Sequence, residues 1–499
     1  MRTSTDQRPT RICVIGGGIS GLAAAHRLVE ESRRRNLQLE IRVLEATNRL
    51  GGVIETTRQE EFLFEGGPDS FITEKPWGVE LCRKIGIESQ LIGTSEQHRQ
   101  TFIVRKGKLL PIPDGFYLLA PTKIWPVVAT PIFSWSAKMR MAADLVLPRK
   151  LTRDGEDESL AHFVERRLGR EALERIAQPL VGGIYTSDPE KLSLRATMPR
   201  FLEMERQHRS LILGMLRQRK RLGVSRGSTL KGPRYGMFVS FEEGMQVLIR
   251  SLEKQLPSSS IELGSKVSLL SRDTSLNRWR LRLANGKDME AEAVCLALPA
   301  YQAGTLLAEV DPEIAERLRK ISYASTITVN LAYRIEDIRQ PMNGFGFVVP
   351  FIEGREILAC TFSHVKFRGR APKKYALLRI FMGGALQPQV FEFEDAELLR
   401  VIQRNLNDLL NINAQPVLTR IVRHPLSMAQ YHVGHLDLVS EIEERLERIP
   451  TLQLAGNAFT GIGIPDCINR GEKCADRLLE RFDDHSHRDG RLPSHAHHY

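Results

Sequence analysis

The sequence predicts an α/β fold, with a parallel sheet flanked by helices and a second, mixed sheet further along the chain. Three observations support this class. First, a strand-like apolar run at 12–15 leads through a glycine-rich turn into a helix-like stretch at 22–34, and a second strand-like run follows at 39–44. Second, another buried strand is expected at 293–298. Third, several strand-like runs follow one another over 327–381, and such a series after an α/β part is typical of a mixed sheet in a second domain.

The turn after the first strand carries a dinucleotide-binding pattern. Gly16, Gly18 and Gly21 have the G-x-G-x-x-G spacing. The first glycine permits a tight turn, the second lets the backbone approach a pyrophosphate, and the third lets the helix pack closely on the strand. The helix would then present free N–H groups and the positive end of its dipole to the phosphates. Glu45 ends the second strand at the spacing expected of the acid that binds a ribose hydroxyl.

Residues 45–52, EATNRLGG, narrow the choice of nucleotide. The continuation through Arg49, Gly51 and Gly52 resembles the extended fingerprint of amine oxidase-like flavin oxidoreductases, in which these residues approach the pyrophosphate and the ring of FAD. An acid at position 45 suits a free ribose 2′-hydroxyl, which favours FAD over NADP. The chain is therefore expected to bind one FAD non-covalently, in a Rossmann-type domain.

Composition indicates a globular protein with two or three subdomains, since the chain has 499 residues, of which 42% are hydrophobic and 26% charged. The first ten residues are polar and lack an apolar core, so no secretory signal is expected. No apolar run is long enough to span a bilayer, and a cytoplasmic location is predicted. The six cysteines form no C-x-x-C pair, so neither a disulfide framework nor a zinc or other metal site is expected.

The net charge of +11 suggests nucleic acid, an anionic membrane surface or an acidic substrate as a partner. The basic residues are dispersed except at 217–221, which Arg226, Lys231 and Arg234 follow. Few aromatic residues lie near this run and no nucleic-acid-binding signature is present. No nucleic acid partner is therefore expected, and the run is interpreted as a solvated, mobile loop.

The apolar stretch 118–147 is interrupted by three prolines, which predicts short helices in place of one long one. Its aromatic and methionine side chains, Trp125, Trp135 and Met139 among them, have two interpretations. They form either the core of a helical subdomain or, with nearby lysines and arginines, an interfacial patch. On the second interpretation, residues 110–147 or so would touch the inner face of the cell membrane.

The remaining elements follow from periodicity, glycine and proline. Strands are expected at 62–64, 101–104, 109–112, 261–267, 280–283, 327–333, 345–350, 357–362, 376–381 and 452–455, with hairpins at 101–112 and around 285–286. Helices are expected at 76–86, 160–168, 171–176, 197–215, 245–255, 395–410 and 468–480. These elements divide the chain into FAD-binding parts at 1–95, 216–300 and 421–482, a helical and substrate subdomain at 96–215, substrate-domain strands at 301–420, and a disordered tail at 483–499.

The C-terminal stretch 454–468, LAGNAFTGIGIPDCI, is expected to supply the second half of the FAD site. A strand, a glycine turn at Gly456 and a helix start bring backbone N–H groups toward the flavin. Taken alone, this stretch is only a loop that enters a helix. Together with the N-terminal fingerprint, it is a specific indication of an FAD site.

Over nearly its whole length the chain resembles the porphyrinogen oxidases, the FAD enzymes of haem biosynthesis. The resembling segments are GGGISGLAAA, EATNRLGG, FEGGPDSFITEKP, PLVGGIYTSDPEKLSLRATMPRF, HRSLILGM, MFVSFEEGMQ, GFGFVVP and GNAFTGIGIPDCINRG. The segments PTKIWPVVATPIFSWSAKMRMAADLVLP and RSLILGM most resemble the bacterial branch. Members of that branch typically act on coproporphyrinogen III, whereas other branches act on protoporphyrinogen IX. The resemblance implies a six-electron oxidation of a porphyrinogen to a porphyrin, with O₂ as acceptor.

The resemblance also assigns residues. FAD contacts are expected at Gly16, Gly18, Gly21, Glu45, Arg49, Gly51, Gly52, Gly67, Val267, Gly456 and Ile464. The wall around the macrocycle would use Gly183, Ile184, Phe347 and Phe381, of which the two phenylalanines would otherwise be interpreted as core residues. Anionic propionates need a basic partner. Lys75 is the first candidate for this partner and Arg99 the second. No protein side chain is expected to be catalytic, because the flavin carries the redox chemistry.

Two alternatives stay open at this point. Another amine oxidase-like flavoenzyme, such as a polyamine oxidase or carotenoid desaturase, shares the fingerprint, but the C-terminal loop offers Phe459 without the paired aromatic residues of an amine cage. A basic peripheral membrane or nucleic-acid binder that retains a flavin fold is the second alternative. The preferred porphyrinogen is not decided, nor is the choice between monomer and homodimer.

Overall fold

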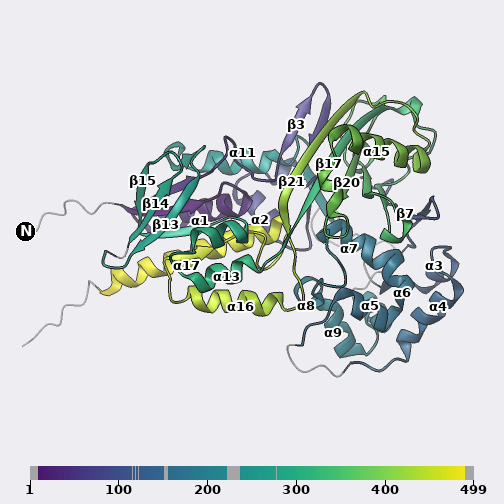
Figure 1. Ribbon diagram of the computed structural model, residues 1–499, viewed down its shortest axis with the longest axis horizontal. Coiled ribbons are helices and arrows are strands. Elements are labelled where there is room, and N and C mark those ends of the chain that lie inside the picture. The colour runs from purple at the N-terminus through teal and green to yellow at the C-terminus, as the bar shows by residue number, and fades with distance from the viewer. Residues whose placement is uncertain are drawn as a thin grey trace, which may run out of the picture.

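The computed structural model describes residues 9–488 except 115, 118, 119, 122, 151–155, 222–236 and 277. Figure 1 shows three parts, namely a layered α/β part on the left, a large twisted sheet at the upper right and a group of helices below it. The α/β class expected from the sequence is confirmed. Within the described ranges, no helix combines the length and the hydropathy that crossing a bilayer requires.

A five-stranded parallel sheet lies at the centre of the α/β part. Its order is β12 (Ile261–Glu262), β2 (Leu39–Leu44), β1 (Thr10–Ile15), β16 (Ala293–Leu296) and β22 (Leu452–Leu454). Every neighbouring pair is parallel. Strands from three distant parts of the chain therefore form one sheet, and the glycine turns that follow β1 and β22 lie at the same edge because parallel strands end together.

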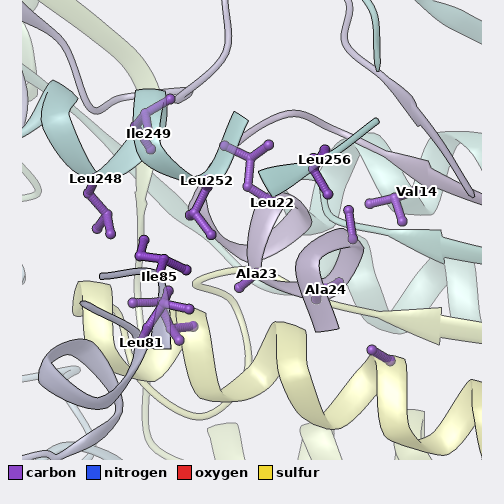
Figure 2. Close-up of a cluster of buried hydrophobic side chains, with 14 of the residues drawn as sticks. Val14, Leu22, Ala23, Ala24, Leu81, Ile85, Leu248, Ile249, Leu252 and Leu256 are labelled. Carbon is purple, nitrogen blue, oxygen red and sulfur yellow. The ribbon is translucent and has the colours of Figure 1, made fainter. Parts of the chain in front are cut away.

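One face of this sheet is covered by α1 (Ile19–Arg35), α2 (Trp77–Lys84), α11 (Gln246–Gln255) and α17 (Ile464–Arg488). Figure 2 shows Leu22 of α1 among side chains of α2 and α11 in this core. Helices α1 and α17 pack without a side chain between them at Gly471, where an added Cβ would lie 2.2 Å from the Ser20 carbonyl oxygen. This close contact joins the two ends of the chain.

The other face carries a second core. A three-stranded antiparallel sheet of β13 (Val267–Asp273), β14 (Arg278–Leu283) and β15 (Asp288–Ala291) packs there with α12 (Ala300–Leu306), α13 (Pro312–Arg319) and α16 (His435–Leu446). Trp279 of β14 is fully buried, and its indole N–H donates to Thr451 Oγ1 at 3.0 Å. The expected hairpin at 285–286 is confirmed as the link between β14 and β15.

The large mixed sheet has seven strands. Its order is β21 (Leu418–Ala429), β17 (Tyr323–Arg334), β20 (Tyr375–Gly383), β19 (Ile357–Phe362), β18 (Gly346–Val348), β7 (Thr101–Arg105) and β8 (Lys108–Pro111). Helix α15 (Asp395–Leu410) covers one face, burying Ile402 and Leu406 against Val329 and Ile380 (Figure 1). On the opposite face, Phe62 and Phe64 pack against Ala332 and Leu377 of the large sheet. The remaining short strands are β3 (Thr56–Gln59), β4 (Phe62–Glu65), β5 (Phe71–Ile72), β6 (Leu91–Gly93) and β11 (Phe238–Phe241).

The helical part contains α3 (Ile124–Ala129), α4 (Trp135–Ala142), α5 (Leu160–Leu168), α6 (Arg170–Ala172), α7 (Gln178–Tyr185), α8 (Leu194–Thr197), α9 (Pro199–His208) and α10 (Leu211–Arg221). Its core holds a buried ion pair in which Arg167 Nε donates to Asp144 Oδ1 at 2.7 Å. The short helices expected in 118–147 are confirmed. Side chains of that stretch differ in burial: Phe133 and Met141 are buried in the helical core, whereas Trp125 and Trp135 are exposed.

Several expected elements differ from the structure. The single helix expected at 197–215 is wrong, because Arg209 adopts a left-handed φ of 62° and Ser210 starts a new helix by accepting from the Leu213 N–H at 3.1 Å. The single strand at 261–267 is also wrong, since Gly264 turns the chain at a φ of 63° and assigns β12 and β13 to different sheets.

Other differences concern boundaries. The basic run 217–221 is the end of helix α10 and not a loop, and Arg226, Lys231 and Arg234 lie outside the described residues. Helix α17 continues to Arg488, so the first residues of the expected disordered tail are helical, and 489–499 lie outside the described part. The boundary expected at 420/421 falls inside β21. The other segment boundaries stay predictions.

Candidate active site

The glycine turn between β1 and α1 is closely packed at Gly16 and Gly21 and open at Gly18. An added Cβ would lie 2.3 Å from the Ala297 carbonyl oxygen at Gly16, and 2.0 Å from the Gly16 carbonyl oxygen at Gly21. At Gly18, by contrast, no heavy atom of the part of the chain that the structure describes lies within 4 Å of an added Cβ. The first and third glycines are therefore required by the protein itself, whereas the second leaves open space next to its backbone.

This open space lies at the start of α1. Gly18 is the residue before the helix, no side chain caps the helix, and its first turn contains no acidic residue. The first N–H groups of an α-helix have no partner within the helix, and together with the dipole they attract anions. This arrangement fits a pyrophosphate.

Glu45 faces the glycine turn, as the sequence predicts. Its Oε2 accepts from the Gly17 N–H at 2.7 Å, and its Oε1 accepts from both the N–H and the hydroxyl of Thr47 at 2.8 Å. The carboxylate is thus buried and held beside the turn. The chain near Val267 is brought to the same place, because the Ser265 N–H donates to the Glu45 carbonyl oxygen at 2.8 Å.

The second part of the fingerprint lies against the first. The Gly51 N–H donates to the Gly17 carbonyl oxygen at 2.8 Å, and an added Cβ on Gly52 would lie 3.4 Å from Gly18 Cα. Arg49 is exposed, and its guanidinium donates to the carbonyl oxygens of Leu50 and Ile54 at 3.3 Å and 3.1 Å. Residues 16–18 and 49–52 therefore form one surface.

The C-terminal half of the predicted site begins at Gly456, just beyond β22. Its φ of 129° and the Leu298 carbonyl oxygen, 3.3 Å from an added Cβ, favour glycine there. Ile464 starts α17, whose first turn is beside α1. The combination of the uncapped start of α1, the open glycine at position 18 and a ribose-type acid fits a flavin dinucleotide, and these residues would hold it.

Gly67 lies in a turn that ties the α/β part to the large sheet. An added Cβ would lie 1.7 Å from the Val53 carbonyl oxygen, and the Gly67 carbonyl oxygen accepts from the buried guanidinium of Arg379 in β20. Asp69 pairs with Lys366 at 2.9 Å and lies 3.7 Å from Arg379. Burial alone would raise the pKa of Asp69, but Lys366 and Arg379 hold it well below its usual value.

Alternation along β20 separates the two aromatic residues expected near the macrocycle. Ile380 lies in the core beside α15, so Arg379 and Phe381 point to the opposite face, with the guanidinium 4.5 Å from the Phe381 ring centre. Phe347 is only 1% exposed and packs in the α15 core. It therefore lies on the far side of the sheet from Phe381, which is the core interpretation that the sequence left open.

The other expected substrate-side residues lie on several separate elements. Gly183 and Ile184 lie at the exposed end of helix α7. The next turn meets β20, because the Ala385 N–H donates to the Thr186 carbonyl oxygen at 2.8 Å. Lys75 joins the start of α17 through an ion pair with Asp466. Arg99 is exposed, and its ion pair is with Glu96 at 3.5 Å.

Asp69, Arg379 and Asp466 were not singled out from the sequence. Each lies beside a residue that was, since the first follows Gly67, the second precedes Phe381 and the third follows Ile464. A charged residue within an otherwise apolar segment, as in LLRIF and IPDCI, is the signal that was available.

Glu65, at the end of β4, predicts a pH dependence of stability. Burial raises its pKa to about 7, although its carboxylate accepts from the Met245 N–H and the Thr56 hydroxyl. The folded state thus binds a proton more tightly than the unfolded chain, so the free energy of unfolding falls as pH rises from about 4 to about 7. We expect the change in the free energy of unfolding caused by Glu65→Gln, relative to wild type, to be about 2.5 kcal/mol more favourable at pH 8 than at pH 5.

Denaturant unfolding at both pH values measures this difference. Glu243→Gln is the matched control, because Glu243 is exposed in the nearby turn, and its two values are expected to agree. An equal change for Glu65→Gln at both pH values would show that Glu65 is ionised throughout.

Comparison with known proteins agrees with this geometry. The profile of the family "Flavin containing amine oxidoreductase" matches residues 19–479. The chain is 36% identical to coproporphyrinogen III oxidase of Bacillus subtilis over 94% of this chain and 97% of that protein. It is 28% identical to the chloroplastic protoporphyrinogen oxidase of Nicotiana tabacum, over 93% of this chain and 84% of that one.

Solved structures show the same relationship. A crystal structure from Exiguobacterium sp. 255-15, assigned as a protoporphyrinogen oxidase, has a TM-score of 0.82 and 31% identity, covering 95% of this chain and all of that one. Cyclohexylamine oxidase from Brevibacterium oxydans has a TM-score of 0.66 but 16% identity, covering 95% of this chain and all of that one, which shows a shared fold alone. The chain therefore belongs to the flavin-containing amine oxidoreductase family, in the group that holds the porphyrinogen oxidases, and its cofactor is a flavin.

Proposed function

We propose that this protein is an FAD-dependent coproporphyrinogen III oxidase, which converts the porphyrinogen to coproporphyrin III with O₂ as the final acceptor. The observation that carries the proposal is the 36% identity to the Bacillus subtilis enzyme over almost the full length of both chains. Non-covalent FAD, when bound, supplies the two-electron oxidation chemistry, which is used three times per porphyrinogen. A porphyrinogen with vinyl groups, protoporphyrinogen IX, is the second substrate to be compared.

The chain's own residues bind and orient the macrocycle. Ile184 and Phe381 offer apolar surface from α7 and β20, and Phe347 packs behind this wall. Gly183 leaves room for a flat ring, because no atom of the described residues lies within 4 Å of an added Cβ. Lys75 is the proposed partner of a propionate, because its ammonium group is close to the start of α17 and reaches solvent. Arg99 is the second candidate.

A direct assay tests the function. Reduced coproporphyrinogen III and protoporphyrinogen IX are supplied separately and anaerobically to the purified holoprotein, and porphyrin fluorescence is followed after air is admitted. We expect fluorescence to rise faster than autoxidation, more so with coproporphyrinogen III, and Lys75→Met to raise KM more for that substrate. If neither porphyrinogen is oxidised above the blank, the proposed function is wrong, and an amine or carotenoid substrate becomes the alternative.

We further propose that α3 and α4 rest on an anionic membrane surface at the inner face of the cell membrane. Trp125 and Trp135 are 77% and 69% exposed, and Met139 and Val146, in α4 and just after it, are also exposed. Lys138 lies 4.6 Å from the Trp135 ring centre, which places a cation next to the apolar patch. Exposed tryptophan with flanking lysine is typical of interfacial binding.

Sedimentation with vesicles checks this surface. We expect the holoprotein to bind phosphatidylglycerol-containing vesicles better than pure phosphatidylcholine vesicles, and the double variant Trp125→Ser, Trp135→Ser to lose about tenfold in affinity because two aromatic side chains no longer insert. Leu276→Ser, which alters an exposed apolar residue in the turn between β13 and β14, is the control. Equal binding by the wild type and the double variant would exclude the patch.

A further inference from the structure

Lys75 and Asp466 form an ion pair that joins the turn after β5 to the first turn of α17. Lys75 Nζ donates to Asp466 Oδ1 at 2.6 Å. The lysine side chain is 39% exposed, whereas that of Asp466 is 8% exposed. The ammonium group is thus reachable by a ligand from solvent while its counter-ion is enclosed by protein.

The Asp466 carboxylate is held in place by the loop that precedes it. An added Cβ would lie 2.3 Å from Asp466 Cγ at Gly461 and 3.1 Å from Asp466 Oδ2 at Gly463. The two glycines therefore leave space that this carboxylate fills. Its charge also reaches the end of α7, where burial and the nearby Asp466 raise the pKa of Tyr185 to about 12.

These contacts decide how Lys75 meets an anion. A carboxylate that approaches Lys75 finds its positive charge already balanced by a buried, immobile carboxylate nearby. Like charges that share one cation repel each other, and a buried group cannot turn away into solvent. The ion pair therefore weakens the attraction of Lys75 for a ligand carboxylate without removing it.

We propose that Asp466 acts on ligand affinity through Lys75, and limits how tightly Lys75 holds the carboxylates of the macrocycle. This inference rests on the proposed function, since it requires an anionic porphyrinogen at Lys75. It assigns to Asp466 a role that acts through Lys75 and not through contact with the flavin. Removing its charge should thus tighten binding of an anionic macrocycle only while Lys75 is present.

A double-mutant cycle tests this coupling, with coproporphyrin III as the probe and fluorescence titration of the holoprotein as the readout. We expect Asp466→Asn to lower Kd about three- to tenfold at low salt, because the full charge of Lys75 becomes available, and the gain to shrink at high salt. In the Lys75→Met background the same change should alter Kd by less than about twofold. A gain of equal size in both backgrounds would overturn the proposal.

Two further variants separate the loss of this charge from damage to helix α17. A second ion pair to α17 comes from α2, where Lys84 Nζ lies 3.1 Å from Glu472 Oε1 and the lysine is 39% exposed. Glu472→Gln is therefore the matched control and is expected to leave the Kd for coproporphyrin III unchanged. Asp466→Ser keeps a short polar side chain in the first turn of α17 if the asparagine variant loses its flavin. If Asp466→Asn or Asp466→Ser keeps its flavin absorbance but binds coproporphyrin III no more tightly than the wild type, the aspartate does not oppose ligand binding.

Failure of the inference differs from failure of the proposed function. If the wild-type holoprotein neither oxidises a porphyrinogen nor binds coproporphyrin III, the function itself is wrong. If the wild type does both and the Asp466 variants bind no more tightly, only the role of Asp466 is wrong.

Discussion

Replacing Gly18 with valine is expected to weaken flavin binding strongly while leaving the apoprotein nearly as stable as wild type. The residue has a φ of −73° and a ψ of 177°, which any L-residue adopts, and among the described residues no heavy atom lies within 4 Å of an added Cβ. The protein alone therefore tolerates a side chain there, at a cost of about 1 kcal/mol for a poorer helix cap. A branched side chain would instead occupy the space in front of the first N–H groups of α1, and we expect FAD affinity to fall at least ~100-fold.

Titration of the apoprotein with FAD, alongside denaturant unfolding without it, separates the two effects. Gly21→Val is the matched comparison, because an added Cβ there would lie 2.0 Å from the Gly16 carbonyl oxygen. That variant is expected to lose both stability and flavin. Normal FAD affinity in Gly18→Val would mean that the pyrophosphate does not approach this turn.

Replacing Arg379 with methionine should lower the free energy of unfolding strongly. The guanidinium is buried, donates to the Gly67 carbonyl oxygen and lies 3.7 Å from the buried Asp69. Removing one partner from a buried charge cluster leaves the other uncompensated, and we expect about 3 kcal/mol of destabilisation because Lys366 still pairs with Asp69. Since Arg379 also holds the Gly67 turn, the variant should bind FAD more weakly and show an altered flavin spectrum.

Chemical denaturation and flavin absorbance measure these two consequences. Arg334→Met is the control from the same sheet, because Arg334 is exposed and lies 3.6 Å from an exposed Glu336. Its free energy of unfolding is expected to change by less than about 0.5 kcal/mol. A similarly small change for Arg379→Met would indicate that the cluster contributes little to the junction between the two sheets.

Helices and strands with strong local signals could be predicted from the sequence. Helix α5 and helix α15 have the bounds that periodicity predicts, and so do β2 and β19. In α15 the buried residues Leu398, Ile402, Leu406 and Leu409 recur every three or four positions. Such elements depend on one buried face, which the order of residues records directly.

Other elements have no comparable local signal. Strand β21 was not predicted, because most of its residues are only partly buried and it contains Pro425, which argues against a strand. Helix α16 was missed as well. The break between α9 and α10 depends on Ser210, whose hydroxyl donates to the buried Asp144 at 2.6 Å, and that contact is made only after folding.

The candidate site also has a part that could be predicted from the sequence and a part that could not. The turn at Gly16–Gly21 could be predicted because its function resides in neighbouring residues, and the parallel sheet then places it next to the C-terminal loop. Phe347 and Phe381 both appeared as candidates, yet their opposite orientations depend on strand register and on which face α15 covers. No periodicity within GFGFVVP or LLRIFMGG distinguishes these faces.

By itself, the sequence determined the α/β class and the glycine-rich nucleotide turn, and through its resemblance to known enzymes the flavin chemistry, because these depend on short segments with local geometry. Only the tertiary structure decided which charges meet. Lys75 and Asp466 are 391 positions apart, and Lys366 and Asp69 are 297 apart. Ion pairs of this kind form where the α/β part, the large sheet and α17 come together, so their partners depend on how these parts pack and not on spacing along the chain.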